Sequence, residues 1–249
     1  MDSKNSHSTQ QAGPLVFDVP QPDDLDEIFG IASGAHPLSD FEEDAAPEAL
    51  AWDLDELWAQ IFHGLGLAFA RRPDIASIGV DSWAVDYALL REGHRLGQVR
   101  HYRDPRNEST VEHLERTFAR SELFSRNGLQ FLPFNTIYQL EAERGDDRLA
   151  RADTLLLVPD YINWRLAGVA GAERTNASTT GLLDARTGAW DPELANHLGV
   201  AGILPQLLEP RSTVGALRPE LAAEFGPRGA WTSLLSPPTT PLARWLPRR

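Results

Sequence analysis

The chain has 249 residues, of which 42% are hydrophobic and none is cysteine, and its net charge is −13. These figures suit a soluble globular protein of one large domain or two small ones, and they exclude disulfides, thiolate metal sites and cysteine nucleophiles. An excess of acidic residues lies between positions 5 and 70, where no Lys or Arg occurs, and this disfavours nucleic-acid binding there. No apolar run is long enough to span a bilayer and the start lacks a signal-peptide pattern, so we expect no membrane partner and a cytoplasmic location.

The first fifty residues differ from the rest in composition. Residues 1–50 are rich in Ser, Gln, Pro, Asp and Glu and show no sustained hydrophobic period, so we expect a poorly ordered acidic leader. A helix signal follows, because Asp53-Leu-Asp-Glu56 fits a capping box and apolar residues recur at helical spacing as far as Phe69. The pattern predicts an amphipathic helix that ends near Arg71.

The stretch 75–90 predicts two strands folded across a short turn. Apolar residues run into the turn and an alternating pattern resumes after it. Because open α/β sheets hold ligands where strands end, the turn residues Asp81, Trp83 and Asp86 become candidate binding groups. The alternative is a plain β-hairpin in which the aspartates make turn hydrogen bonds and Trp83 belongs to the core.

Strands and helices interleave along the rest of the chain. The sequence predicts a third strand over 97–102 and helices beginning at Ser109, over 136–144, over 159–168 and over 191–198. This order predicts the α/β class. The last segment, 228–249, is too rich in proline for a helix or a central strand, so we expect a disordered tail there.

Common catalytic and cofactor motifs are absent from the sequence. The seven histidines have no spacing typical of a zinc site, and no Gly-x-Ser-x-Gly nucleophile elbow occurs. Residue order alone leaves a Ser-His-Asp triad open. Neither a phosphate-binding P-loop nor a Gly-x-Gly-x-x-Gly dinucleotide turn is present. The residues by themselves therefore predict no metal site and no nucleotide site.

Five sequence blocks resemble successive motifs of one enzyme family. They are Asp81-Ser-Trp-Ala-Val-Asp86, Tyr102-Arg-Asp-Pro-Arg106, Gly128-Leu-Gln-Phe-Leu-Pro-Phe-Asn-Thr-Ile-Tyr-Gln-Leu140, Pro159-Asp-Tyr-Ile-Asn-Trp-Arg-Leu-Ala-Gly168 and Thr175-Asn-Ala-Ser-Thr-Thr-Gly-Leu182. In order and spacing they closely resemble rhamnulokinases, members of the FGGY carbohydrate kinase family, over roughly 51–209. The resemblance implies an actin-like, ribonuclease-H-like kinase of two domains that uses ATP and Mg²⁺ to convert a small-molecule sugar, L-rhamnulose, to L-rhamnulose 1-phosphate. It places the kinase N-terminal domain at 51–227.

The resemblance also implies which residues meet the sugar. In the family the first block lines the sugar site and has a glycine at the position of Ala84, whose methyl group could crowd the ketose. Trp83 offers an apolar face to sugar C–H groups, while Asp86 and Arg103 can hydrogen-bond hydroxyls. Asn135 is a further candidate, with a helix N-cap as an equally good interpretation.

Parts that the family needs for phosphoryl transfer have no counterpart in the sequence. Nothing in 1–50 resembles the first phosphate-binding loop, and the Ala-Ser-His-Asp-Thr block with the catalytic Asp and the second, adenine-binding domain are missing. Transfer depends on positioned Mg²⁺, phosphate-binding amides and a base, so we expect this chain alone to be inactive, with no catalytic, metal or cofactor residue. The alternatives are a non-catalytic sugar-binding or partner-binding remnant and, third, a hydrolase that uses Asp81 and Asp86 as an acid/base pair.

The tail suggests an origin for the missing block. Back-translated in another reading frame, 236–245 can spell Ala-Ser-His-Asp-Thr-Ala-Ser-Ala-Val, which contains the catalytic block of the family. We therefore hypothesise a frameshift between about Phe225 and Trp231. On this hypothesis 228–249 is an out-of-frame translation.

Overall fold

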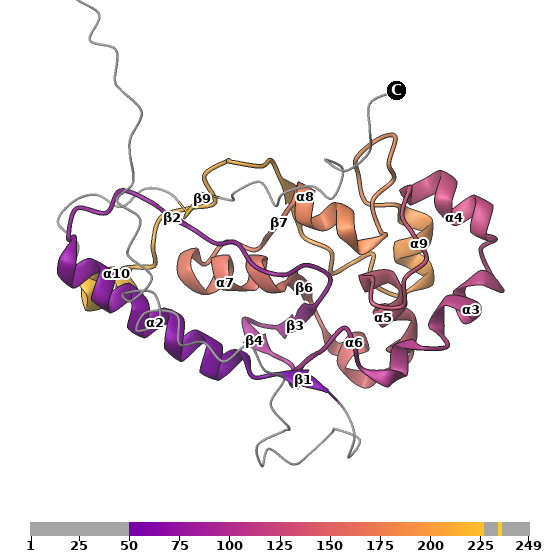
Figure 1. Cartoon of the computed structure of the whole chain (residues 1–249), viewed down its shortest axis with the longest axis horizontal. Coiled ribbons are helices and arrows are strands. Elements are labelled where there is room, and N and C mark those ends of the chain that lie inside the picture. Colours follow the sequence, from indigo (N-terminus) through magenta and orange to yellow (C-terminus); the bar gives the residue numbers. More distant parts are fainter. Residues whose placement is uncertain (1–49, 227–233, 236–249) are drawn as a thin grey trace, which may run out of the picture. The chain divides into compact units, whose positions relative to one another are not determined.

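The computed structural model describes residues 50–226 and 234–235, which all belong to one compact unit, 34–249 (Figure 1). The leader predicted over 1–50, apart from Leu50, lies outside the described residues, as does the tail predicted over 228–249 apart from two residues. None of the helices within 50–226 combines the length and the apolar character that crossing a membrane requires.

The first helix forms where the capping pattern predicted it. Helix α2 spans Leu54–Arg71, and the carboxylate of Asp53 accepts hydrogen bonds from two backbone N–H groups of its first turn. The Glu56 side chain accepts from Gln60 instead of turning back to the cap, so the cap is one-sided rather than a reciprocal box.

A three-stranded antiparallel sheet lies at the centre of the described unit. Its strand order is β4 (His94–Arg95), β3 (Tyr87–Arg91) and β6 (Thr154–Leu157). The predicted hairpin over 75–90 is wrong, because its first strand, β2 (Ile78–Gly79), does not pair with β3. Instead β3 turns into β4 across Glu92 and Gly93, whose φ angles of 50° and 77° are the left-handed ones that a two-residue hairpin turn needs.

The remaining elements are short. In order they are β1 (Ala51–Trp52), β5 (Val99–Arg100), η1 (Pro105–Asn107), α3 (Thr110–Glu115), α4 (Arg120–Asn127), α5 (Thr136–Ala142), α6 (Asp147–Arg151), α7 (Val158–Ala167), β7 (Gly171–Glu173), α8 (Arg174–Ala177), η2 (Ser178–Thr180), α9 (Pro192–His197), β8 (Gln206–Leu208) and α10 (Pro219–Phe225). Strands β1 and β5 pair antiparallel, and β7 and β8 pair parallel. The helices predicted over 136–144, 159–168 and 191–198 are confirmed, and Asp191 caps the last of them. The helix predicted to begin at Ser109 is α3, which has Ser109 at its N-cap position, although the Ser109 side chain makes no capping bond.

Helices cover both faces of the central sheet. Side chains of a strand alternate between the two faces, and here the side chains on each face are apolar and have to be buried. Tyr87, Leu89, Leu155 and Leu157 pack into one buried cluster with residues of α3, α5 and α9. The intervening residues of β3 and β6 pack into a second cluster with α2 and α7. Both faces are apolar, as expected for strands buried between helical layers, and the predicted α/β class is confirmed.

Part of the predicted tail forms regular structure. Leu234–Leu235 make strand β9, which pairs parallel with β2 (Figure 1). The rest of the segment 228–249 lies outside the described residues, so its disorder stays a prediction.

Candidate functional site

Asp86, just before β3, is fully buried and draws three side chains together. Its Oδ2 atom accepts from Nε1 of Trp52 at 2.6 Å and from Nε1 of Trp83 at 3.1 Å, and its Oδ1 accepts from Nε2 of Gln139 at 3.0 Å. Burial raises the pKa of Asp86 to about 6, although these hydrogen bonds and one from the Tyr102 backbone act in the opposite direction. Segments far apart in the sequence thus converge on one carboxylate.

The residue before Asp86 has a strained backbone. Val85 has a φ of 72°, and the N–H of Asp86 donates to the carbonyl of Ala84 at 3.0 Å, so the three residues form the rarer, positive-φ type of γ-turn. Such a φ is unfavourable for a β-branched residue. The Val85 carbonyl accepts from Thr136 Oγ1 at 2.7 Å and from Gln139 Nε2 at 3.3 Å. Two residues of α5 therefore hold the turn in this conformation.

Four rings lie in a row beside this carboxylate, and we call them the aromatic strip. The centroid distances are 4.3 Å from Trp83 to Trp52, 4.4 Å from Trp52 to His101 and 4.4 Å from His101 to Tyr102. His101 is buried, whereas the other three rings are only half-buried and keep some apolar surface accessible. The guanidinium of Arg103 lies 5.3 Å from the centroid of the Tyr102 ring, at the end of the strip.

The four predicted substrate residues differ in accessibility. Trp83 and Ala84 are half-buried and Arg103 is exposed, so a ligand can reach each of them. Asp86 was expected to hydrogen-bond sugar hydroxyls, but its side chain is 0% exposed and both of its oxygens already accept from N–H groups. Asp81 is exposed at the surface.

Asn135 does not act as the helix cap that one interpretation predicted. It occupies the N-cap position of α5, yet its side chain makes no capping hydrogen bond. Its Nδ2 donates to the carbonyl of Gln130 at 3.0 Å. The side chain therefore fixes the apolar loop that leads into α5.

Trp52 and Gln139 are site residues that sequence reasoning missed. Trp52 stands 34 positions before Asp86, and only the pairing of β1 with β5 brings it to that carboxylate. Two paired residues in each strand are too short a pattern to find in a sequence. Gln139 lies inside a helical pattern, which indicates that its side chain is buried but not which residue it hydrogen-bonds. The only available signal was its presence in the third family-like block.

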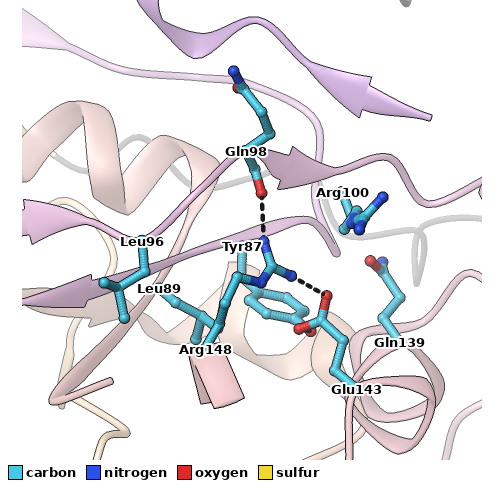
Figure 2. Close-up of a pocket in the computed structure, with 8 residues that line it drawn as sticks. All are labelled: Tyr87, Leu89, Leu96, Gln98, Arg100, Gln139, Glu143 and Arg148. Atoms are coloured by element: carbon cyan, nitrogen blue, oxygen red, sulfur yellow. Dashed lines mark hydrogen bonds and ion pairs between the residues drawn. The ribbon is translucent and has the colours of Figure 1, made fainter. Parts of the chain in front are cut away.

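Gln139 also lines a small polar cavity of about 10 Å³ (Figure 2). The lining residues are Tyr87, Leu89, Leu96, Gln98, Arg100, Gln139, Glu143 and Arg148. Tyr87 donates its hydroxyl hydrogen to Glu143 Oε2 at 2.7 Å, and Arg148 Nη2 donates to Glu143 Oε1 at 2.9 Å. The cavity has room for about one water molecule, so it is too small for a sugar.

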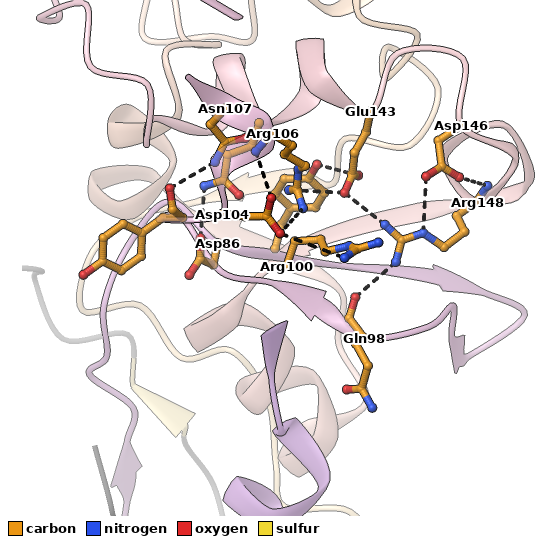
Figure 3. Close-up of polar contacts among 12 residues, drawn as sticks. Asp86, Gln98, Arg100, Asp104, Arg106, Asn107, Glu143, Asp146 and Arg148 are labelled. Atoms are coloured by element: carbon orange, nitrogen blue, oxygen red, sulfur yellow. Dashed lines mark hydrogen bonds and ion pairs between the residues drawn. The ribbon is translucent and has the colours of Figure 1, made fainter. Parts of the chain in front are cut away.

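The second family-like block is divided between two environments. Asp104 accepts from the backbone N–H of Leu50 at 3.0 Å and of Arg106 at 2.9 Å. Arg106 Nη2 lies 3.3 Å from Glu143 Oε1 (Figure 3). These charges tie η1 to α5 and to the start of β1. Arg103, in contrast, is exposed beside the aromatic strip, so it is the charged residue of this block that a ligand can reach.

Sequence comparisons point to one family. Residues 28–230 match the sequence model described as the FGGY family of carbohydrate kinases, N-terminal domain. A rhamnulokinase of Yersinia pestis bv. Antiqua (strain Angola) is 42% identical over 168 residues, which are 66% of this chain and 35% of the relative. A rhamnulokinase of Bacillus subtilis (strain 168) is 42% identical over 165 residues, 66% of this chain and 33% of the relative. The chain thus spans about a third of the length of these relatives.

Solved structures of several kinases share the fold. A xylulose kinase from Lactobacillus acidophilus gives a TM-score of 0.70 at 19% identity, covering 78% of this chain and 41% of that one. A glycerol kinase from Plasmodium falciparum, solved with ADP, gives a TM-score of 0.66 at 15% identity, covering 80% of this chain and 42% of that one. At such low identity the likeness concerns the fold alone. Together with the family match it confirms the predicted fold class of an FGGY kinase N-terminal domain.

Proposed function

We propose, because the chain belongs to the FGGY family of carbohydrate kinases, that it forms the sugar-binding half of a kinase that phosphorylates L-rhamnulose to L-rhamnulose 1-phosphate with ATP. The observation that supports the substrate is the 42% identity to rhamnulokinases of two distant bacteria. The kinase class follows from the family. The substrate, and the assignment of this chain to the sugar-binding half of the kinase, are our proposals.

The accessible residues of the site suit a ketose, which presents both hydroxyl groups and C–H faces. The half-buried indole of Trp83 provides an apolar face for the C–H groups. The exposed guanidinium of Arg103 provides N–H donors for hydroxyl oxygens. Ala84 lies at the strained turn, where its methyl group narrows the approach to the backbone. Asp86 is a fourth member of the site, buried beneath these contacts.

We assign no ATP-binding or Mg²⁺-binding role to the described residues. Kinases transfer the γ-phosphoryl group of ATP with the help of Mg²⁺, which neutralises charge on the phosphates. Within residues 50–226, no group of three or more His, Asp or Glu side chains is arranged to hold a metal ion. The sequence also lacks an Ala-Ser-His-Asp-Thr block. We therefore expect the chain by itself to bind sugar without turnover.

Two assays on the purified 249-residue chain test this proposal. Tryptophan emission should respond to L-rhamnulose at lower concentrations than to D-xylulose or glycerol, and a coupled ADP-release assay should stay at background. The Ala84→Gly variant should bind L-rhamnulose more tightly, because the methyl group that narrows the site is removed.

Two results would contradict the proposal. An equal response to the three compounds, or none at all, would reject L-rhamnulose as the ligand. Turnover by the unmodified chain that Asp86→Ala abolishes would show that the chain contains its own nucleotide site, so the half-site description would be wrong.

A further inference from the structure

One oxygen atom of Asp86 holds two indole rings. Trp52 and Trp83 both donate their Nε1 hydrogens to Asp86 Oδ2, at 2.6 Å and 3.1 Å, from segments 34 and 3 residues away in the sequence. The two rings lie 4.3 Å apart between centroids with planes inclined by 35°. Since both indole N–H groups are satisfied internally, the rings can offer a ligand only their apolar surface.

Plain packing does not require a carboxylate at this position. Removing an ionised carboxyl group from water is unfavourable, and well-packed apolar residues often replace buried charges without loss of stability. A carboxylate does, however, accept from several donors at once in fixed directions. Here it orients two half-buried rings and, through Oδ1, the fully buried amide of Gln139. We therefore interpret Asp86 as a residue that positions the two indole rings and the Gln139 amide.

The rings that Asp86 orients belong to a surface with the mixed character of a sugar site. Beyond Trp52 the aromatic strip continues through His101 to Tyr102, whose ring lies 6.1 Å from that of Phe134. Phe134 is 39% exposed. Arg103, over the Tyr102 ring, adds exposed N–H donors at the end of the strip. Apolar faces beside a few hydrogen-bond donors complement the C–H faces and hydroxyls of a sugar.

We propose that Trp83, supported from behind by Trp52, forms an aromatic wall against which the C–H face of the ketose packs, and that Asp86 is the positioning residue of this wall and not a sugar ligand. Trp52 lies between Trp83 and His101, so it supports the wall and does not itself offer a ring face. The inference rests on the proposed function, and it adds Trp52, from outside the family-like blocks, to the site.

Circular dichroism tests the positioning role without any sugar. Two neighbouring indoles that are inclined to each other give an exciton couplet in the far ultraviolet. The couplet should be lost in Trp52→Leu and Trp83→Leu and kept in Trp190→Leu. Trp190 is the matched control, because its Nε1 donates elsewhere, to the carbonyl of Pro205. Asp86→Leu should lose the couplet, since it has about the same size but no oxygen to accept from either indole. A full couplet in folded Asp86→Leu overturns the positioning role.

A second variant covers the case in which Asp86→Leu does not fold. Asp86→Glu keeps the charge and moves its oxygens by one methylene group, so the couplet should change in size or sign. An unchanged couplet in this variant also overturns the positioning role. Both variants are compared with the unmodified chain by far-ultraviolet helix content and by the cooperativity of urea unfolding.

L-Rhamnulose titrations test the wall itself. Trp52→Leu and Trp83→Leu should each weaken binding by about tenfold or more, because buried tryptophans dominate contact energies, while Trp190→Leu should bind as the unmodified chain does. If the unmodified chain binds the sugar and Trp52→Leu binds it equally well, the wall is wrong and the proposed function stands. If the unmodified chain does not bind, the proposed function and the wall both fail, and the couplet still decides the role of Asp86.

Discussion

The burial of Asp86 makes stability depend on pH. Its pKa is raised from 3.8 to about 6 in the fold, so the folded chain holds this proton more tightly than the unfolded chain does. The stabilising contribution of Asp86 is therefore fully present below about pH 4 and is lost as the pH rises through 6, by about 3 kcal/mol. Asp86→Asn does not titrate, so its free energy of unfolding in urea should depend less steeply on pH between about 4 and 6.

Asp184 supplies a control of opposite sign for that experiment. Its pKa is lowered, chiefly because the backbone N–H groups of Thr187 and Arg186 donate to its carboxylate. Its contribution is present above the ordinary pKa of 3.8 and is lost as the pH falls below that value, so Asp184→Asn should change the slope in the other direction below about pH 4. Asp160, whose burial raises its pKa to about 7, is present in every variant and cancels in the differences. Parallel curves for Asp86→Asn and the unmodified chain would contradict the raised pKa.

The strained turn at Val85 makes a prediction about glycine. Val85→Gly removes more buried surface than Val85→Ala, yet it relieves the φ of 72°, so the glycine variant should be at least as stable as the alanine one. Val111, in α3, is a matched site because its exposure of 8% resembles the 9% of Val85. There glycine should be less stable than alanine by up to about 1 kcal/mol. Urea unfolding of the four variants measures both differences, and the same order at both sites would exclude strain at Val85.

At the scale of elements, local patterns were predictable and distant pairings were not. Helix α2 forms as predicted because its cap and its apolar spacing lie in one continuous stretch. The hairpin over 75–90 was wrong because alternation identifies a strand without its partner, and β3 pairs with β4 and β6. The site shows the same limit. The first family-like block indicated Trp83 and Asp86, whereas Trp52 reaches them only through the pairing of β1 with β5.

The parallel pair β7–β8 allows a test of packing between elements. Glu173 and Leu208 lie opposite each other there, and a Cβ atom added to Gly171 would lie 2.7 Å from Leu208 Cγ. Gly171→Ala should therefore destabilise the chain by about 1–3 kcal/mol through overpacking. Adding Leu208→Ala makes room for the methyl group, so the double variant should lose less stability than the sum of the single ones. Additive losses in urea unfolding would show that Leu208 moves aside freely.

At the scale of the whole molecule, the family match can be set beside the predicted boundaries, which stay predictions. It begins at residue 28, inside the predicted leader of 1–50, and ends at 230, close to the predicted end of the domain at 227. Part of the acidic segment thus lies within the matched range, although its composition gave no helix or strand period. The site residues all come from 50–139, within a chain that spans about a third of its rhamnulokinase relatives.

The end of the chain provides the last prediction. Truncation after Pro227 removes 228–249 and with it β9, whose only paired residues are Leu234 and Leu235. A pair of two-residue strands contributes little to the free energy of unfolding, since each hydrogen bond adds about 1 kcal/mol net. The conformational entropy lost when the segment becomes ordered offsets part of this gain. A segment translated out of frame has not been selected to pack, so we expect truncation to lower the free energy of unfolding in urea by less than about 1 kcal/mol.

Leu54→Ala, in the buried core, is the control variant, and it should lower the free energy of unfolding by about 2–5 kcal/mol. A loss of the Leu54→Ala size on truncation would mean that the tail docks through selected contacts, and the frameshift hypothesis would then be wrong.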